Sequence, residues 1–280
     1  MVKYTYTHLD EFFVLSQWIE DVKGPFGLRP PPGDWASFKA RIQALNDACP
    51  PGESVKVIYA ARHGQAEHNA LADKYGEGAQ IKYPTLDPDL TTLGRSQAFE
   101  TRLALQREIK RGMPVPSKWF VSPFKRAGET CGIEWGFMFS DEYEIDGGNY
   151  NGGKGHGVNA TVIENIREHL HVHVCDKRCS ISQLKSQFTS FNYSKDMIDE
   201  DLIWQPIEIR DRETEEELVA RRGEGIREIL EKSQGDTYIS ITAHSGTLRG
   251  IYKSLNVIPR KLVVGEMNIL VIRVKELQES

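Results

Sequence analysis

The chain has 280 residues, of which 39% are hydrophobic and 27% are charged. This is the composition of a globular protein, and it excludes a disordered or fibrous chain. The formal net charge of −5 argues against a nucleic-acid partner, because affinity for a phosphate backbone needs a dense basic surface. The length suits either one large α/β domain or two ordinary ones.

The sequence shows no run of about 18 apolar residues, and its first residues lack the apolar region of a secretory signal. Four cysteines are too few for a disulfide framework in a chain of this length. We therefore expect no membrane partner and a cytoplasmic location, with the nucleus as a second option. The oligomeric state is not predicted.

Residues 1–54 are expected to form a helical N-terminal extension that packs on the core. Phe12, Leu15 and Ile19 repeat with helical spacing, which predicts a helix over residues 9–22. Prolines between residues 24 and 34 end that helix, and a second one is predicted over residues 35–48.

A second domain is expected over residues 55–280, where strands alternate with helices. Short β-branched and apolar runs predict strands over 55–61, 118–121, 237–243 and 269–274. Helical patterns occupy 92–111, 125–139 and 213–233. The alternation predicts an α/β fold, a three-layer α/β/α sandwich with a largely parallel sheet. Residues 141–212 are interpreted as an inserted cap over one edge of that sheet.

Three of the predicted strands end in residues suited to phosphate chemistry. Arg-His-Gly occupies 62–64, Ser-Pro-Phe-Lys-Arg occupies 122–126, and His-Ser-Gly occupies 244–246. Because the carboxyl ends of parallel strands meet at one edge of a sheet, the three segments are expected to converge.

His63 is the candidate nucleophile. A histidine attacks phosphorus only when its ring is neutral and oriented, and the transferred group needs cations or N–H donors around its oxygens. Arg62 is adjacent to it, and Gly64 permits a sharp turn of the backbone. A helix beginning near residue 65 would turn its free N–H groups toward an anion, and Asn69 in that helix is within reach of the same oxygens.

A longer pattern surrounds this triplet. Leu-Thr-x-x-Gly-x-x-Gln-Ala occupies 90–98, and Ser-Pro-x-x-Arg-Ala-x-x-Thr occupies 122–130, ahead of the late His-Ser-Gly turn. In these motifs the chain resembles the histidine phosphatase superfamily, the phosphoglycerate-mutase-like fold, over about residues 55–275. The segment His-Val-Cys-Asp-Lys-Arg at 173–178 is similar to a fungal branch of that superfamily.

The resemblance implies a phosphohistidine on His63, formed without a metal or another cofactor. It implies that His63, Glu168 and His244 are catalytic. It also implies a phosphate-binding set composed of Arg62, Asn69, Arg126, His244 and Ser245.

Glu168 is assigned as the acid because its surroundings are similar to the Leu-x-Glu segment of the superfamily. A carboxylic acid there protonates the leaving alcohol, and the carboxylate then activates water against the phosphohistidine. Glu164, Glu142 and Asp146 lie nearby in the sequence and are the alternatives.

The predicted function is metal-independent hydrolysis of a small phosphomonoester such as a sugar phosphate. A mutase of the phosphoglycerate-mutase type is an alternative, since it would hand the phosphoryl group from the same histidine to a second hydroxyl. A non-catalytic binding or scaffold protein of the same fold and metal-assisted hydrolysis are further alternatives.

Two other segments carry charged or metal-binding side chains. The histidines and cysteines within 169–179 include zinc ligands by type, but their spacing fits no structural zinc site. The alternation of apolar residues over 170–174 predicts a strand-like stretch instead. Residues 210–222 are interpreted as a solvated helix face with ion pairs, and Arg210 or Arg212 as a substrate-selecting group is the alternative.

Overall fold

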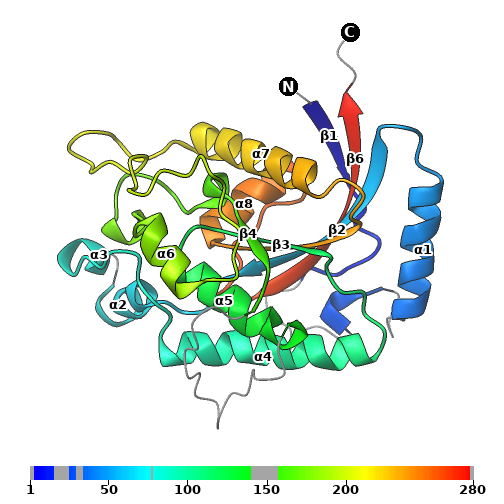
Figure 1. The fold of residues 1–280 in the computed structure, drawn as a ribbon, viewed down its shortest axis with the longest axis horizontal. Helices are drawn as coiled ribbons and strands as arrows, with labels where there is room; N and C mark the ends of the chain where they lie inside the picture. The colour runs from blue at the N-terminus through cyan, green and yellow to red at the C-terminus, as the bar shows by residue number, and fades with distance from the viewer. Residues whose placement is uncertain (1–2, 16–24, 30–33, 77, 140–156, 278–280) are drawn as a thin grey trace.

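The computed structural model describes residues 3–15, 25–29, 34–76, 78–139 and 157–277. Its centre is a six-stranded sheet in the order β1-β6-β2-β5-β3-β4 (Figure 1). The strands are β1 (Lys3–His8), β2 (Glu53–Arg62), β3 (Lys118–Val121), β4 (Ala160–Val162), β5 (Tyr238–Ala243) and β6 (Met267–Leu277).

The sheet is mixed but mostly parallel. β2 pairs in parallel with β5, β5 with β3, and β3 with β4. β6 lies antiparallel between β2 and β1, and it alone of these six strands runs against the others. The predicted α/β fold with a largely parallel sheet is confirmed.

The helices follow the strands in sequence. They are α1 (Trp35–Asp47), α2 (Glu67–Tyr75), α3 (Ala79–Lys82), α4 (Thr92–Lys110), α5 (Lys125–Trp135), α6 (Ile181–Gln187), α7 (Glu215–Lys232) and α8 (Ser245–Ser254). Short 3₁₀ turns occupy Pro25–Gly27, Gly136–Met138, Glu164–Ile166 and Val174–Asp176. Each helix in the described parts of the chain is too short or too polar to cross a membrane.

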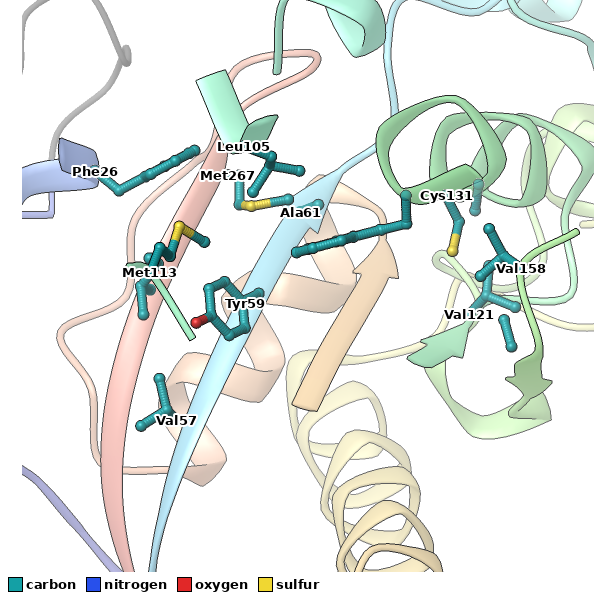
Figure 2. Packing of buried hydrophobic residues seen from close by; sticks show 14 of the residues in the cluster. Phe26, Val57, Tyr59, Ala61, Leu105, Met113, Val121, Cys131, Val158 and Met267 are labelled. Carbon is teal, nitrogen blue, oxygen red and sulfur yellow. The ribbon is translucent and has the colours of Figure 1, made fainter. Parts of the chain in front are cut away.

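Alternate side chains of β2 pack into two separate hydrophobic cores. Val57, Tyr59 and Ala61 pack with residues of α1, α4 and α5, as Figure 2 shows for part of this cluster. Ile58 and Ala60 pack on the opposite face against α7 and α8. Because successive side chains of a strand point to opposite faces, one apolar strand holds both helical layers, which lie on the two sides of the sheet in Figure 1.

The predicted helix over residues 9–22 is wrong where the structure describes it. Residues 9–15 form a turn and an isolated bridge between Phe13 and Leu28, and residues 16–22 lie outside the described residues. Phe12 and Phe13 are both buried and pack against Phe38. Their burial follows from this packing and not from an amphipathic helix. The second predicted helix is present as α1.

The chain begins with β1 rather than with a helical extension. The sequence of β1 is Lys-Tyr-Thr-Tyr-Thr-His, and its side chains are alternately exposed and partly buried. This period of two is that of a strand. β1 covers the outer edge of β6, so residues from the expected extension belong to the central sheet. The division into domains at residue 54 and the inserted cap stay predictions.

Residues 170–174 do not form a strand. They make bends that lead into the 3₁₀ turn at Val174–Asp176, and His171 has a φ of 71°. A positive φ is incompatible with an extended strand, which explains why the apolar alternation misled the prediction.

Candidate active site

The carboxyl ends of β2, β3 and β5 bring the predicted residues together. Arg62 ends β2, Ser122 follows β3 and His244 follows β5, and these three strands are adjacent. A cavity of about 400 Å³ opens at this edge. Of the predicted site residues, it is lined by Arg62, His63, Asn69, Glu168 and Ser245.

The ring of His63 is held in one tautomer. Its Nδ1 lies 2.7 Å from the carbonyl oxygen of Gly64, and a carbonyl only accepts hydrogen bonds. Nδ1 therefore carries the proton, which leaves a lone pair on Nε2. Burial, followed by the charges of Arg126 and Arg62, lowers the pKa of His63 well below its ordinary value. The ring is neutral at physiological pH, as a nucleophile must be.

The turn that carries His63 depends on a close backbone approach. A Cβ on Gly64 would overlap the carbonyl of Gly94, and a Cβ on Gly94 would overlap the carbonyl of Gln65. Thr91 N donates to the Gln65 carbonyl (2.9 Å), and Gln65 N donates to Gln97 Oε1 (2.8 Å). The glycines and polar residues of the 90–98 motif therefore shape the turn from outside the cavity.

The 122–130 motif holds the same turn from the other side. Gly64 N donates to Thr130 Oγ1 (3.1 Å), and that hydroxyl donates to the Arg126 carbonyl (2.8 Å). His63 and Arg126 are thus connected through one threonine within α5.

Arg126 is completely buried and lies behind the cavity wall rather than among the lining residues. Its Nη1 donates to the Cys175 carbonyl (2.9 Å), and its Nη2 donates to Asp176 Oδ1 (3.2 Å). The guanidinium stacks 4.5 Å from the ring centroid of Phe124. Its Nε is buried and has no hydrogen-bond partner in the described parts of the chain.

Further buried polar atoms without described partners surround His63. They are Arg62 Nε and His244 Nδ1. Arg62 Nη1 donates to the Leu262 carbonyl (2.6 Å), and His244 Nε2 lies 2.7 Å from Ser122 Oγ. The rings of His63 and His244 are 5.0 Å apart. Native proteins rarely leave buried polar atoms without a partner. Three such atoms at one pocket rich in cations indicate that the pocket binds an anion.

Asn69 and Ser245 occupy helix starts at the cavity. Asn69 Oδ1 accepts from Ala66 N (3.0 Å) at the start of α2, so its amide NH₂ is the group left to donate. Ser245 is the first residue of α8, whose free N–H groups favour an anion.

Glu168 is positioned from α7 and α8. Arg221 donates to the Glu168 carbonyl (3.1 Å), and the Glu168 carboxylate accepts from His169 N (3.0 Å) and Gly246 N (3.3 Å). Burial by itself would raise the pKa of Glu168, but His169, Arg222 and Arg126 outweigh it and hold that pKa below its ordinary value. The free protein therefore carries a carboxylate at this position.

No family model matches the chain. Over 234 residues it is 30% identical to a probable phosphoglycerate mutase of Arthroderma benhamiae, which covers 80% of this chain and 64% of that protein. The chain thus spans just under two thirds of that relative. Over 223 residues it is 29% identical to the probable phosphoglycerate mutase PMU1 of Saccharomyces cerevisiae, covering 71% of this chain and 72% of that protein. The chain is thus similar to proteins of the phosphoglycerate-mutase type, which agrees with the resemblance of its motifs to the histidine phosphatase superfamily.

Solved structures with lower identity also align with this chain. Ecdysone phosphate phosphatase from Bombix mori, in complex with tungstate, is 15% identical with a TM-score of 0.47, covering 76% of this chain and 88% of that one. A mycobacterial glucosyl-3-phosphoglycerate phosphatase, in complex with VO3, is 17% identical with a TM-score of 0.40, covering 71% and 81%.

The alternative acids do not line this cavity where the structure describes them. Glu164 pairs with Arg167 (2.9 Å) and Arg178 (3.2 Å) and lines a different cavity. Glu142 and Asp146 lie outside the described residues.

The interpretation of residues 210–222 as a solvated face is partly wrong. Arg222 is fully buried, and its Nη1 donates to the Asn165 carbonyl (3.2 Å). Glu213 is also buried and pairs with Arg221. The face of α7 that carries Arg222 packs on the segment before Glu168, so charge did not predict exposure. Of the two candidate selecting arginines, only Arg212 lines the cavity.

Several lining residues were not assigned to the site from the sequence. They are His68, Gln80, His169, His173, Cys175, Asp176, Gly246, Arg249 and Lys261. Gly246 belongs to the His-Ser-Gly motif, and His169 and residues 173–178 belong to the His/Cys cluster or to the family-like segment; the others gave no signal.

The thiols and imidazoles of 169–179 show no arrangement typical of a zinc site. Burial raises the pKa of Cys175 and of Cys179, so both are protonated thiols, whereas zinc binds thiolates. His171 Nδ1 accepts from Gln205 N (3.0 Å). The described residues contain no group of three or more His, Cys, Asp or Glu arranged to hold a metal.

Proposed function

We propose that this chain hydrolyses small phosphomonoesters through a phosphohistidine on His63, without a metal. The observation that carries the proposal is a neutral, buried His63 with its lone pair on Nε2, at a site where buried polar atoms of Arg62, Arg126 and His244 have no hydrogen-bond partner among the described residues. A phosphoryl group supplies the negative oxygens that such a pocket lacks, and positioning plus charge stabilisation is most of what phosphoryl transfer needs.

In the first step, Nε2 of His63 forms a bond to phosphorus while the P–O ester bond breaks, and Glu168 gives a proton to the departing oxygen. Glu168 must therefore hold a proton when the ester bond breaks. A phosphomonoester that enters as its monoanion supplies this proton to the carboxylate. Arg62, Arg126 and the amino end of α8 stabilise the charge on the transferred group.

In the second step, Glu168 takes a proton from water as the water oxygen attacks phosphorus and the P–N bond breaks. The products are the alcohol and inorganic phosphate. Glu168 and Arg212 belong to the predicted cap over residues 141–212, whose described part is 157–212, and both line this cavity. The names of the curated relatives make phosphoglycerate mutase activity the second candidate.

The test is phosphate release from a panel of sugar phosphates, phosphoglycerates and p-nitrophenyl phosphate, with and without a chelator. We expect chelator-resistant turnover that falls by about a thousandfold or more in His63→Ala. His8→Ala on β1 is the control and should keep full activity. Turnover lost with chelator, or retained in His63→Ala, would exclude the mechanism. Interconversion of phosphoglycerates without phosphate release would establish the mutase instead.

A further inference from the structure

Asp176 lies between the buried Arg126 and the cavity. The cavity is lined by Asp176, while Arg126 is behind it, and the two side chains are joined by the 3.2 Å hydrogen bond from Nη2 to Oδ1. Asp176 is 7% exposed, and its backbone is held by Arg167, whose Nη2 donates to the Asp176 carbonyl (3.0 Å). A phosphate that reaches Arg126 therefore arrives next to a buried carboxylate.

That arrangement places like charges together. Two unit negative charges about 4 Å apart repel by about 4 kcal/mol at the effective dielectric of a protein site. Arg126 offsets one of them, but a phosphate dianion brings two. The repulsion is relieved if Asp176 is protonated, because the neutral acid then donates a hydrogen bond to a phosphate oxygen.

We propose that Asp176 is a positioning residue that takes up a proton when a tetrahedral dianion binds at Arg126. In the free site it accepts from the arginine, and in the complex it is a neutral donor to the bound anion. The inference rests on the proposed function only in making Arg126 a ligand of the phosphate. It assigns a role to the Cys-Asp segment that the hydrolysis scheme leaves unused.

The charged groups facing Asp176 come from several elements. Arg126 belongs to α5, Arg167 and Glu168 follow the 3₁₀ turn at Glu164–Ile166, and Arg212 precedes α7. Burial most of all raises the pKa of Asp176, to about 7; Arg126 opposes this rise, and Glu168 adds to it. By contrast, burial lowers the pKa of His63 and of His244 well below its ordinary value. Asp176 is therefore poised to change its protonation near neutral pH.

The pKa of Asp176 sets how the affinity for a dianion depends on pH. Below about pH 7 Asp176 is already protonated, so binding of a dianion takes up no proton there and does not depend on pH. Above it, each bound dianion requires one proton, and affinity falls by about tenfold per pH unit.

Sulfate is the probe, because it is a tetrahedral dianion that neither gains nor loses a proton near neutral pH. Titration calorimetry at pH 8, in buffers with different ionisation heats, gives the number of protons taken up per sulfate. We expect about one proton for the unmodified protein and about none for Asp176→Asn. Between pH 8 and pH 9 the sulfate Kd should rise by about tenfold in the unmodified protein and stay level in the variant.

Glu168→Gln is the matched comparison, because it removes the other carboxylate that lines this cavity. It should keep the uptake of about one proton. The proposal is overturned if Glu168→Gln abolishes the uptake, if Asp176→Asn retains it, or if the unmodified protein does not bind sulfate. Should Asp176→Asn fail to fold, the result for Glu168→Gln still decides. If sulfate binds with the expected proton uptake but none of the phosphomonoesters is hydrolysed, the proposed hydrolysis is wrong and this inference stands.

Discussion

His63 shows how a single residue acquires its chemistry from a backbone atom. The Gly64 carbonyl accepts from Nδ1 and so directs the lone pair to Nε2. Burial, followed by the charges of Arg126 and Arg62, lowers the pKa of the ring and keeps it neutral. The tautomer and the charge state are thus set by two different causes, hydrogen bonding and electrostatics. A histidine lacking either would be misoriented or protonated.

Glu134 is a buried acidic residue that lowers the free energy of unfolding near neutral pH. It lies in α5, is fully buried, and its carboxylate oxygens have no partner in the described parts of the chain. Burial raises the pKa of Glu134 well above its ordinary value. Because the folded pKa is raised, the stability associated with Glu134 is full below the unfolded pKa and is lost as pH rises toward the folded pKa.

We therefore predict that Glu134→Met stabilises the protein at pH 7.5 by about 1–3 kcal/mol, since it removes an unpaired buried acid. The gain should shrink at pH 5, where the unfolded state also retains more of its proton. Urea denaturation at the two pH values measures it. Glu100→Met, at an exposed position of α4, should change stability by less than about 0.5 kcal/mol. A destabilised Glu134→Met at both pH values would contradict the prediction.

At the scale of the element, α7 holds the segment that carries Glu168, the proposed acid. Its first turn carries three glutamates and a capping box from Thr214 to Glu217, which suits the positive end of the helix dipole. Further along, Arg221 and Arg222 hold the backbone of the segment that carries Glu168. The helix thus holds the segment of the proposed acid without lining the cavity.

Two glycines of α7 give a matched test of this packing. A Cβ on Gly223 meets nothing within 4 Å, whereas a Cβ on Gly225 lies 2.9 Å from Ile166 Cγ2. Gly223→Ala should stabilise the protein by about 0.5–1 kcal/mol, because alanine favours a helix interior. Gly225→Ala should destabilise it by about 1–3 kcal/mol, because of overpacking, and lower kcat by displacing Glu168. Denaturant melts and kinetics on the two variants measure both; equal effects would show that α7 does not position the acid.

At the scale of the whole molecule, charge is distributed unevenly. The chain carries a formal net charge of −5, yet the candidate active-site cavity is lined by Arg62, Arg212, Arg249 and Lys261. Arg249 is paired with Glu215. Arg212 and Lys261 lie at the exposed rim of the cavity, where they attract anions from solution and are screened by salt.

We predict that Arg212→Ala and Lys261→Ala each raise KM by about three- to tenfold at low ionic strength, with a smaller change in kcat. The increase should be larger for a substrate with a second anionic group than for p-nitrophenyl phosphate, and it should diminish at high salt. Arg210→Ala is the control, because Arg210 pairs with Glu217 and does not line the cavity. Equal KM changes in all three variants would refute a role for the rim.

The sequence by itself determined the alternation of strands and helices and the residues at the strand ends. Periods of two and 3.6 are local properties of the chain, so β2, β3, α4 and α5 were predicted to within a few residues. The Arg-His-Gly turn and the 90–98 and 122–130 motifs were likewise legible, because they reflect close contacts between fixed backbone segments.

Only the tertiary structure decided which residues reach the site from distant segments. β1 was taken for part of a helical extension because its partner β6 lies more than 250 residues away in the sequence. Arg222 was taken for a surface residue because burial of a charge depends on what packs over it. Lys261 carried no local pattern, and Asp176 carried only the resemblance of residues 173–178 to a fungal branch. Their place in the cavity is set by irregular backbone, which sequence periodicity does not encode.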